Sequence, residues 1–248
     1  MKRNVIISVV FMISSLVVMN AQTSDKKLEY NLSLGFNIGG TTPIGLPAEI
    51  RGINSYQPTL NLTVGASVIK MFSPKWGIDA GLRFENKGMK TGVDVKNWQM
   101  TVNIQSGDDT GTKTGYFTGS IKNKTSISYL TLPIKAVYRL NDKWDLKGGF
   151  YFSYAMERSF TGNVVEGQIR ETPLHPVIGI TKADYDYSDD LRKFDTGIEL
   201  GANWKVYKSL AVHANLTWGF LTALDPNKRR VDMDNYNVYF NIGVNYTL

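Results

Sequence analysis

The 248-residue sequence contains no cysteine, which excludes disulfide bonds and thiolate metal sites. The same absence excludes a lipid-modified cysteine at a mature N-terminus. Histidine is rare, with 2 residues in the whole chain. Charged residues make up 20% and apolar residues 42%, a balance that is typical of a folded chain. The 23 glycines, with 13 tyrosines, 11 phenylalanines and 5 tryptophans, favour β-structure with many turns.

Only the N-terminal segment has a long apolar run. The basic pair Lys2-Arg3 precedes an apolar stretch at 5–18, and Ala21 offers a small residue for cleavage. This pattern predicts a secretory signal peptide over residues 1–21, followed by a periplasmic N-terminal segment at 22–28. A membrane anchor is the alternative, but the 14-residue stretch is shorter than the ~20 residues that a spanning helix needs.

The rest of the chain places apolar residues at every second position in eight segments. In the fourth segment, Leu130, Leu132 and Ile134 alternate with Thr131 and Lys135. A period of two puts the two sets on opposite faces of a strand, which no helix does. The eight segments are 29–38, 59–70, 76–87, 127–140, 144–156, 193–206, 210–221 and 236–248.

One face of these segments carries no charge, and the other carries a sparse, balanced set among glycines and asparagines. A soluble, lipocalin-like barrel would turn the apolar face inward around a ligand. Balanced charges instead favour a packed, salt-bridged lumen, so we expect the apolar face to meet lipid. We expect the charged side chains to form one connected ion-pair network with no continuous water path. The five acids are Asp79, Glu85, Asp145, Asp195 and Glu199, and the five bases are Arg83, Lys135, Arg139, Lys147 and Lys205.

Short and long connections alternate between the segments, as in outer-membrane barrels with short periplasmic turns and long outer loops. The predicted fold is all-β: an eight-stranded antiparallel up-and-down transmembrane β-barrel over residues 29–248. Aromatic residues near both strand ends support two interfacial girdles. The sequence therefore predicts a multi-pass protein of a Gram-negative outer membrane. The short connections are 71–75, 141–143 and 207–209, and the long ones are 39–58, 88–126, 157–192 and 222–235.

Three motifs resemble those of the PorT-type, porin-like outer-membrane β-barrel family. They are the strand Ser128-Tyr129-Leu130-Thr131-Leu132-Pro133-Ile134-Lys135, the hairpin Asn141-Asp142-Lys143-Trp144 and the strand Lys193-Phe194-Asp195-Thr196-Gly197. The resemblance covers residues 29–248 and implies an eight-stranded barrel. PorT itself is tied to a secretion and gliding apparatus. The barrel motifs alone are no reason to assign that role to this chain. The last strand also looks like the signal that barrel-assembly machinery recognises, although it ends Tyr246-Thr247-Leu248 rather than on a phenylalanine.

No group of residues in the sequence supports catalysis. His213 falls on the polar face of the seventh segment, where a hydrogen-bonded interior histidine is favoured over a catalytic one. His175 lies in the third long connection without a local Ser/His/Asp arrangement. The acidic run at 184–190 lacks the glycine and the distal glutamate of a calcium loop. We predict no enzymatic activity, no metal and no cofactor.

Three roles fit such a barrel. The first is a structural or interaction protein that displays its outer loops, the second a narrow porin or small-solute-binding barrel, and the third a lipid-modifying enzyme. We favour the first, because ten buried charges must be paired and would fill a narrow lumen. Outer-membrane lipids and lipopolysaccharide are expected partners, and Lys228-Arg229-Arg230 could contact lipid phosphates. The net charge of +6, or +4 without the leader, does not indicate nucleic acid.

The second long connection, at 39 residues, is too long for a simple surface loop. It keeps a strand-like alternation, with turn chemistry near Asp108 and Asp109. We predict that strands three and four continue as a protruding hairpin whose open edge contacts an envelope or surface protein, or a surface glycan. A flexible loop is the alternative. The candidate interaction residues are Trp98, Asp108, Asp109 and Tyr116.

Overall fold

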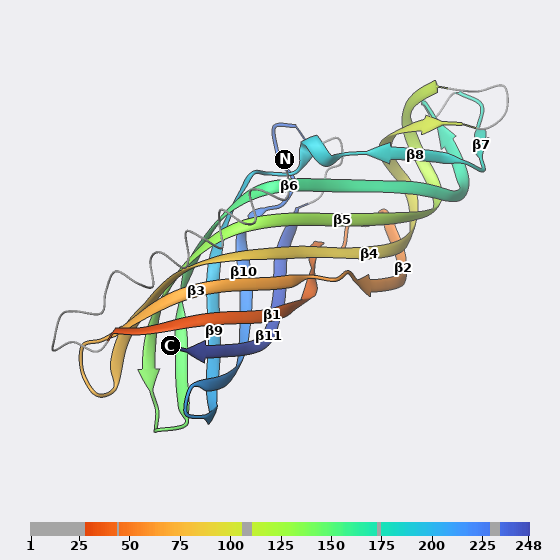
Figure 1. Ribbon diagram of the computed structural model, residues 1–248. Helices are drawn as coiled ribbons and strands as arrows, with labels where there is room; N and C mark the ends of the chain where they lie inside the picture. The colour runs from red at the N-terminus through yellow and green to blue at the C-terminus, as the bar shows by residue number, and fades with distance from the viewer. Residues whose placement is uncertain (1–27, 44, 106–110, 173–174, 229–233) are drawn as a thin grey trace, which may run out of the picture.

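The computed structural model describes residues 28–43, 45–105, 111–172, 175–228 and 234–248. Within these ranges the chain is almost entirely antiparallel β-structure, which confirms the predicted fold class (Figure 1). The described residues contain no helix of the length and apolarity needed to cross a membrane. The predicted leader, the tip residues Asp108 and Asp109, and the basic residues Arg229 and Arg230 lie outside the described residues.

Eight strands form the barrel wall, and each overlaps one of the alternating segments of the sequence. Each strand pairs antiparallel with two neighbours, and the pairing of the first with the last closes the ring. The wall consists of β1 (Leu28–Pro43), β3 (Leu62–Met71), β4 (Trp76–Ile104), β5 (Gly111–Arg139), β6 (Trp144–Arg170), β9 (Phe194–Tyr207), β10 (Leu210–Thr222) and β11 (Asn235–Thr247).

Tight turns join the strands at one end of the barrel, which we call the short-turn end. In the turn between β5 and β6, the side-chain oxygen of Asn141 accepts hydrogen bonds from the backbone N–H groups of Lys143 and Trp144, at 2.9 and 3.0 Å. Ser73 accepts in the same way from Trp76 at 3.0 Å. Asn and Ser therefore hold these turns through the local bonds that such residues favour.

The barrel is apolar outside and polar inside. Leu34 and Leu200 on the outer face are 54% and 56% exposed, whereas Asn241 and Glu199 on the inner face are 2% and 0% exposed. This is the reverse of a soluble protein, in which such leucines would be buried. A closed ring of strands with an apolar exterior can lie in lipid, because pairing between neighbouring strands supplies hydrogen-bond partners for the backbone of the wall.

Glycine on the inner face lets neighbouring strands approach closely. A Cβ atom at Gly197 would lie 2.0 Å from the carbonyl oxygen of Trp218, and one at Gly149 would lie 2.1 Å from that of Ile134. Any side chain at these positions would force the strands apart. The inner glycines thus permit the tight curvature of a narrow barrel.

Three of the barrel strands, β4, β5 and β6, continue far beyond the others at the end opposite the short turns (Figure 1). The continuation of β4 and β5 confirms the predicted hairpin. β8 (Ala183–Asp186) pairs with both β4 and β6, so these strands form a second closed ring. We call this ring the cap; it comprises residues 93–104, 111–121, 162–170 and 178–187, including β7 (Ile178–Ile180), which pairs with β6.

The edge of the hairpin is therefore not open as the sequence suggested. β2 (Ile50–Pro58) pairs with β4 along residues 89–95, and β8 covers Asn103 and Ile104. Between them, the Tyr187 hydroxyl donates to the Thr101 carbonyl at 2.8 Å and accepts from its N–H at 3.0 Å. The long connections supplied the covering strands, which the sequence analysis treated as loops.

The cap has its own apolar core. β5 shows the change most clearly, because the same set of alternate residues faces inward along its length. In the barrel that inward set includes Thr131 and Lys135, whereas in the cap it includes Phe117 and Ile121. The cap is therefore built like a soluble protein, with apolar side chains inside and polar ones outside. Its buried core includes Val95, Trp98, Met100, Val102, Ile104, Phe117, Val164, Ile169 and Tyr185.

A bulge at Asn97 keeps β4 in this pattern. Asn97 has a positive φ of 54°, and the pairing of β4 with β5 shifts register between Val95 and Trp98. The extra residue shifts the alternation by one position. The inward-facing residues of β4 are therefore odd-numbered up to Val95 and even-numbered from Trp98 and Met100 onward. Trp98 was expected at an exposed edge, but it is 9% exposed and belongs to the cap core.

We expect Val102→Asp to unfold the cap and leave the barrel intact. Val102 is fully buried, so the substitution buries an unpaired charge and lowers the free energy of unfolding of the cap by about 3 kcal/mol or more. Limited proteolysis should then cut within the cap, while the barrel keeps its heat-modifiable electrophoretic mobility. Gln99→Asp, on the exposed face of the same strand, is the matched control and should change neither result.

Candidate functional site

The lumen holds a continuous chain of charged side chains, which we call the central ion network. Its middle is Glu199, which binds Arg83 and Lys135, each at 2.8 Å. From Lys135 the chain continues to Asp79 at 4.0 Å and then to Lys147 at 2.8 Å. From Arg83 it continues in the other direction to Glu85 at 3.2 Å, Lys87 at 3.5 Å and Asp195 at 3.9 Å. The four acids and four bases of this network balance.

Strand register explains why these residues meet. All eight come from β4, β5, β6 and β9, which are consecutive in the ring. The opposite wall, β1, β3, β10 and β11, supplies neutral polar groups instead. There Asn241 donates to Asn37 at 2.8 Å and to Thr63 at 3.1 Å. One wall of the lumen thus carries the charges, and the other completes the polar interior with amides and hydroxyls.

A second group, the short-turn ion cluster, lies at the short-turn end. Arg139 binds Glu29 at 3.1 Å and Asp145 at 3.2 Å, and Lys205 binds Asp145 at 3.2 Å. These two acids and two bases also balance. No ion pair between described residues joins the cluster to the central network, so the charges form two groups and not the single network that the sequence suggested.

The structure brings all ten predicted lumen residues into these two groups and adds Lys87 and Glu29. Both additions lie on the polar face of their strands, at the end of the third segment and at the start of the first. Lys87 continues the set that contains Arg83 and Glu85, and this spacing was the available signal. Lys87 also pairs with Asp195 of β9, and Glu29 pairs with Arg139 of β5; these contacts between strands could not be found from sequence.

Lys87 is enclosed by aromatic rings. Its ammonium group lies 5.3 Å from the ring centre of Tyr129, 4.8 Å from that of Tyr151 and 5.7 Å from that of Tyr239. The side chain is fully buried, and cation–π attraction offsets part of its desolvation. Tyr151 also donates to Asp195 at 3.1 Å. We call Lys87 with these three rings the tyrosine cage; it fills the lumen at the end nearer the cap.

The space left beside the central ion network is small. A cavity among Asp79, Arg83, Lys135, Lys147 and His213 has a volume of about 40 Å³, which holds very few water molecules. Packed side chains therefore occupy the part of the lumen that the network crosses.

Neither histidine is arranged for acid–base catalysis. His213 Nε2 lies 2.8 Å from the side-chain oxygen of Asn241, and His175 Nδ1 lies 2.6 Å from the hydroxyl of Thr172. Neither contact supplies the carboxylate that orients a catalytic imidazole. In the part of the chain that the structure describes, no three His, Asp or Glu side chains are grouped to hold a metal ion.

The cap carries a surface groove of about 680 Å³. Trp98 and Tyr116, two of the four predicted interaction residues, both line it, together with Glu49, Gln99 and Thr114. Tyr116 is 43% exposed, whereas Trp98 is mostly buried in the cap core. The groove thus combines a flat aromatic ring with polar side chains.

Side-chain hydrogen bonds join neighbouring strands of the cap and its base, on both the inner and the outer face. Burial raises the pKa of Tyr185, so its hydroxyl stays protonated and donates to the side-chain oxygen of Asn123. The hydroxyl of Ser120 donates to Asp94 at 2.5 Å, and this bond lowers the pKa of the Asp94 carboxyl. The acidic stretch around Asp184 is similarly engaged, since Asp184 accepts from Gln105 at 2.8 Å.

Comparison with known proteins identifies the family. Residues 20–225 match a family model described as outer membrane protein beta-barrel domain. No curated protein sequence matches the chain. Among solved structures, CarO2 of Acinetobacter baumannii is similar at 11% identity, with a TM-score of 0.42 over 89% of this chain and 99% of that one.

Two further solved structures are similar at comparable levels. Ail of Yersinia pestis, in complex with the heparin analogue sucrose octasulfate, has 9% identity and a TM-score of 0.34 over 91% of this chain and 100% of that one. The outer membrane protease OmpT of Escherichia coli has 13% identity and a TM-score of 0.37 over 92% and 98%. At these values the likenesses identify neither an activity nor a partner.

We expect the two ion groups to differ in their contribution to stability. Arg83→Met leaves Glu199, which is fully buried, with one partner fewer and should lower the free energy of unfolding by about 3–5 kcal/mol. Arg139→Met removes a guanidinium that is 23% exposed, and Asp145 keeps Lys205, so the loss should be about 1 kcal/mol. Guanidinium unfolding in detergent micelles measures both. Equal losses in the two variants would contradict this ranking.

Proposed function

This chain belongs to the outer membrane protein β-barrel domain family, and from that premise we propose that it is a barrel with a closed lumen that holds the cap for contact with a partner. It is an outer-membrane protein, and its apolar exterior suits lipid. The observation that carries the proposal is the closure of the lumen by the central ion network and the tyrosine cage. The side chains that fill the lumen hold the strands of the wall, and with them the cap, in a fixed position.

The cap supports a role in contact with a partner. It has a buried core, a ring of paired strands and a groove that presents Tyr116 beside Gln99 and Thr114. An exposed tyrosine among polar groups is typical of a protein-binding surface, because the ring supplies apolar area and the hydroxyl a hydrogen bond. We propose an envelope or surface protein as the partner and place the cap on the outer side of the membrane. Because the cap is already folded, binding at this groove would lose little conformational entropy.

The finer assignments are part of the same proposal. We propose that residues 1–21 are a signal peptide, that residues 22–28 are a periplasmic segment and that the barrel spans residues 29–248. The motifs at 128–135 and 193–197 support membership of the PorT-type group. Insertion by barrel-assembly machinery and contact with lipopolysaccharide follow from the outer-membrane location. We propose no enzymatic activity, since both histidines have neutral partners.

Conductance and partner capture test the proposal separately. In planar bilayers the protein should produce no reproducible conductance steps, because the cavity along the ion network is too small for a hydrated ion. Regular steps of one size would contradict the closed lumen.

Capture of a partner from intact envelopes tests the groove. Tyr116→Ala with Gln99→Ala should abolish recovery of the partner, because both side chains line the groove. Lys124→Ala, on an exposed position of β5 outside the groove, is the control and should leave recovery unchanged. Undiminished recovery with the groove variant would show that the partner, if recovered, binds elsewhere.

A further inference from the structure

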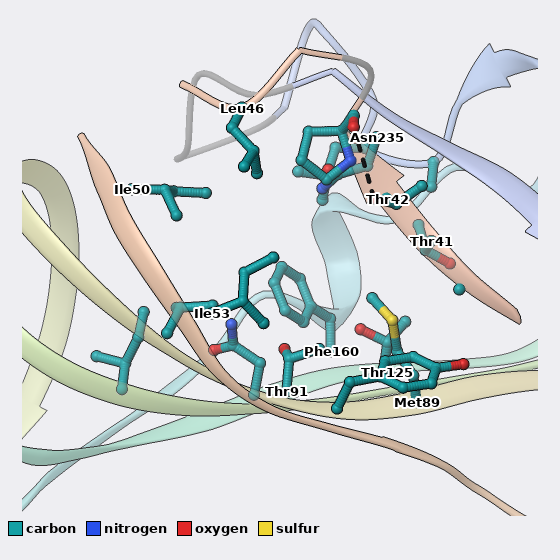
Figure 2. Close-up of a pocket in the computed structure, with 18 of the residues that line it drawn as sticks. Thr41, Thr42, Leu46, Ile50, Ile53, Met89, Thr91, Thr125, Phe160 and Asn235 are labelled. Atoms are coloured by element: carbon teal, nitrogen blue, oxygen red, sulfur yellow. Dashed lines mark hydrogen bonds between the residues drawn. The ribbon is translucent and has the colours of Figure 1, made fainter. Parts of the chain in front are cut away.

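A second cavity, of about 380 Å³, lies between the barrel and the cap, and we call it the mouth cavity (Figure 2). β2 contributes Ile50 and Ile53 to its lining, β4 contributes Met89, and Phe160 of β6 lies against the same space (Figure 2). Its volume falls within the range of about 300–1,000 Å³ that is usual for small-molecule sites. Trp98 lines both this cavity and the groove that carries the proposed partner-binding role, and the other lining residues of the two sites differ.

The wall of the barrel is incomplete beside this cavity. β1 pairs with β3 as far as Phe36 and Leu62, and the Asn37 N–H then donates to the Asn61 carbonyl at 2.8 Å. On the side of the cap beyond Asn37 and Asn61, β1 has no partner in β3. There the preceding strand β2 pairs with β4 and not with β1. Between the described parts of β1 and β2 there is no strand ladder. Within the described residues, the Tyr56 hydroxyl of β2 donates a hydrogen bond to the Gly39 carbonyl of β1 at 2.5 Å.

The gap faces the membrane at its interface. Across the ladder with β11, Gly40 lies opposite Val238 and Thr42 lies opposite Tyr236. Val238 and Tyr236 are the last apolar residues of the outer face of β11 on the side of the cap. The gap therefore lies at the level where the apolar exterior ends, and a molecule in the bilayer interface meets it from the side.

The lining selects for a neutral molecule. It is mainly apolar, and no Asp, Glu, Lys, Arg or His belongs to it. A charged ligand would therefore be buried without a counter-charge, which is unfavourable. A hydrocarbon body fits the part formed by Ile50, Ile53 and Phe160.

One buried polar atom in the lining is left without a partner. Asn235 is 5% exposed, and its side-chain oxygen makes no hydrogen bond. A buried acceptor in this state is costly, and a ligand that donates an O–H or N–H group would satisfy it once the Asn235 side chain turns its oxygen into the cavity. The ligand should therefore have a donor at one end of its apolar body.

We propose that the mouth cavity binds a neutral single-chain amphiphile with a hydrogen-bond donor, such as a long-chain alcohol, which enters sideways between β1 and β2. The donor group bonds to Asn235 and the chain lies among the apolar side chains. The site has no continuation through the barrel. Thr125 belongs to its floor, and Tyr129 of the tyrosine cage lies on the same inward row of β5, about 13 Å further along the strand.

Photo-crosslinking tests the site. The probe is a diazirine analogue of 1-dodecanol, added to the full-length protein in lipid nanodiscs, and the labelled peptides are identified by mass spectrometry. We expect labelling within residues 50–56 and 89–95. 1-Dodecanol should prevent it at lower concentrations than dodecane, which lacks the donor, or dodecanoate at pH 9, which is charged. Labelling confined to the lipid-facing exterior, or equal protection by all three compounds, would overturn the proposal.

Asn235→Leu tests the role of the donor. It should raise the concentration of 1-dodecanol that is needed for protection about fivefold, and leave that of dodecane unchanged or lower. The matched control is Asn215→Leu, because Asn215 is also buried with an unpartnered side-chain oxygen but lines the lumen cavity. An equal effect of the two substitutions would overturn the assignment of Asn235.

A cavity-filling variant keeps the test decisive if Asn235→Leu does not fold. Ala223→Phe places a ring in the mouth cavity, so labelling should fall to the level of nanodiscs whose protein is pre-saturated with 1-dodecanol. Heat-modifiable mobility shows whether each variant is folded. Full labelling of the same peptides in folded Ala223→Phe protein would contradict the site.

Discussion

The structure depends on the closure of its backbone hydrogen bonds. In lipid an unpaired amide or carbonyl has no water to bind, so the pairing of β1 with β11 is what permits the other strands to lie in the membrane. A ring of so few strands has a narrow interior that side chains fill. That interior cannot take unpaired charges, because their desolvation would exceed the gain from closing the ring. The balance of acids and bases in the lumen follows from this constraint.

The two ion groups satisfy that constraint in different surroundings. The central network is buried, and each carboxylate in it has at least one cationic neighbour, with Glu199 held between Arg83 and Lys135. The short-turn cluster is partly open to water, so its pairs contribute less to stability. The charges of the central network come from one wall, and the amides come from the other. This arrangement makes the lumen a polar core, held by directional bonds in place of apolar packing.

Above the membrane the same strands reverse their polarity. Thr131 and Phe117 both face inward on β5, one among the polar side chains of the lumen and the other in the dry core of the cap. The reversal follows the solvent: lipid outside the barrel favours an apolar exterior, and water outside the cap favours a polar one. The mouth cavity lies where the two patterns meet. It has the apolar lining of the cap and an opening in the wall of the barrel, which is why a membrane-borne amphiphile suits it.

The sequence by itself determined the barrel. Alternation with a period of two marks the eight wall strands, and the spacing of the charges identifies ten of the twelve residues in the two ion groups. These features are local, because side-chain direction in a strand depends only on position along it. The tertiary structure decided what depends on contacts between distant segments. Examples are the tyrosine cage around Lys87, the closure of the cap by β8 and the burial of Trp98 through the bulge at Asn97. Register between strands and a single left-handed residue determine these features, and alternation along one strand carries no information about either.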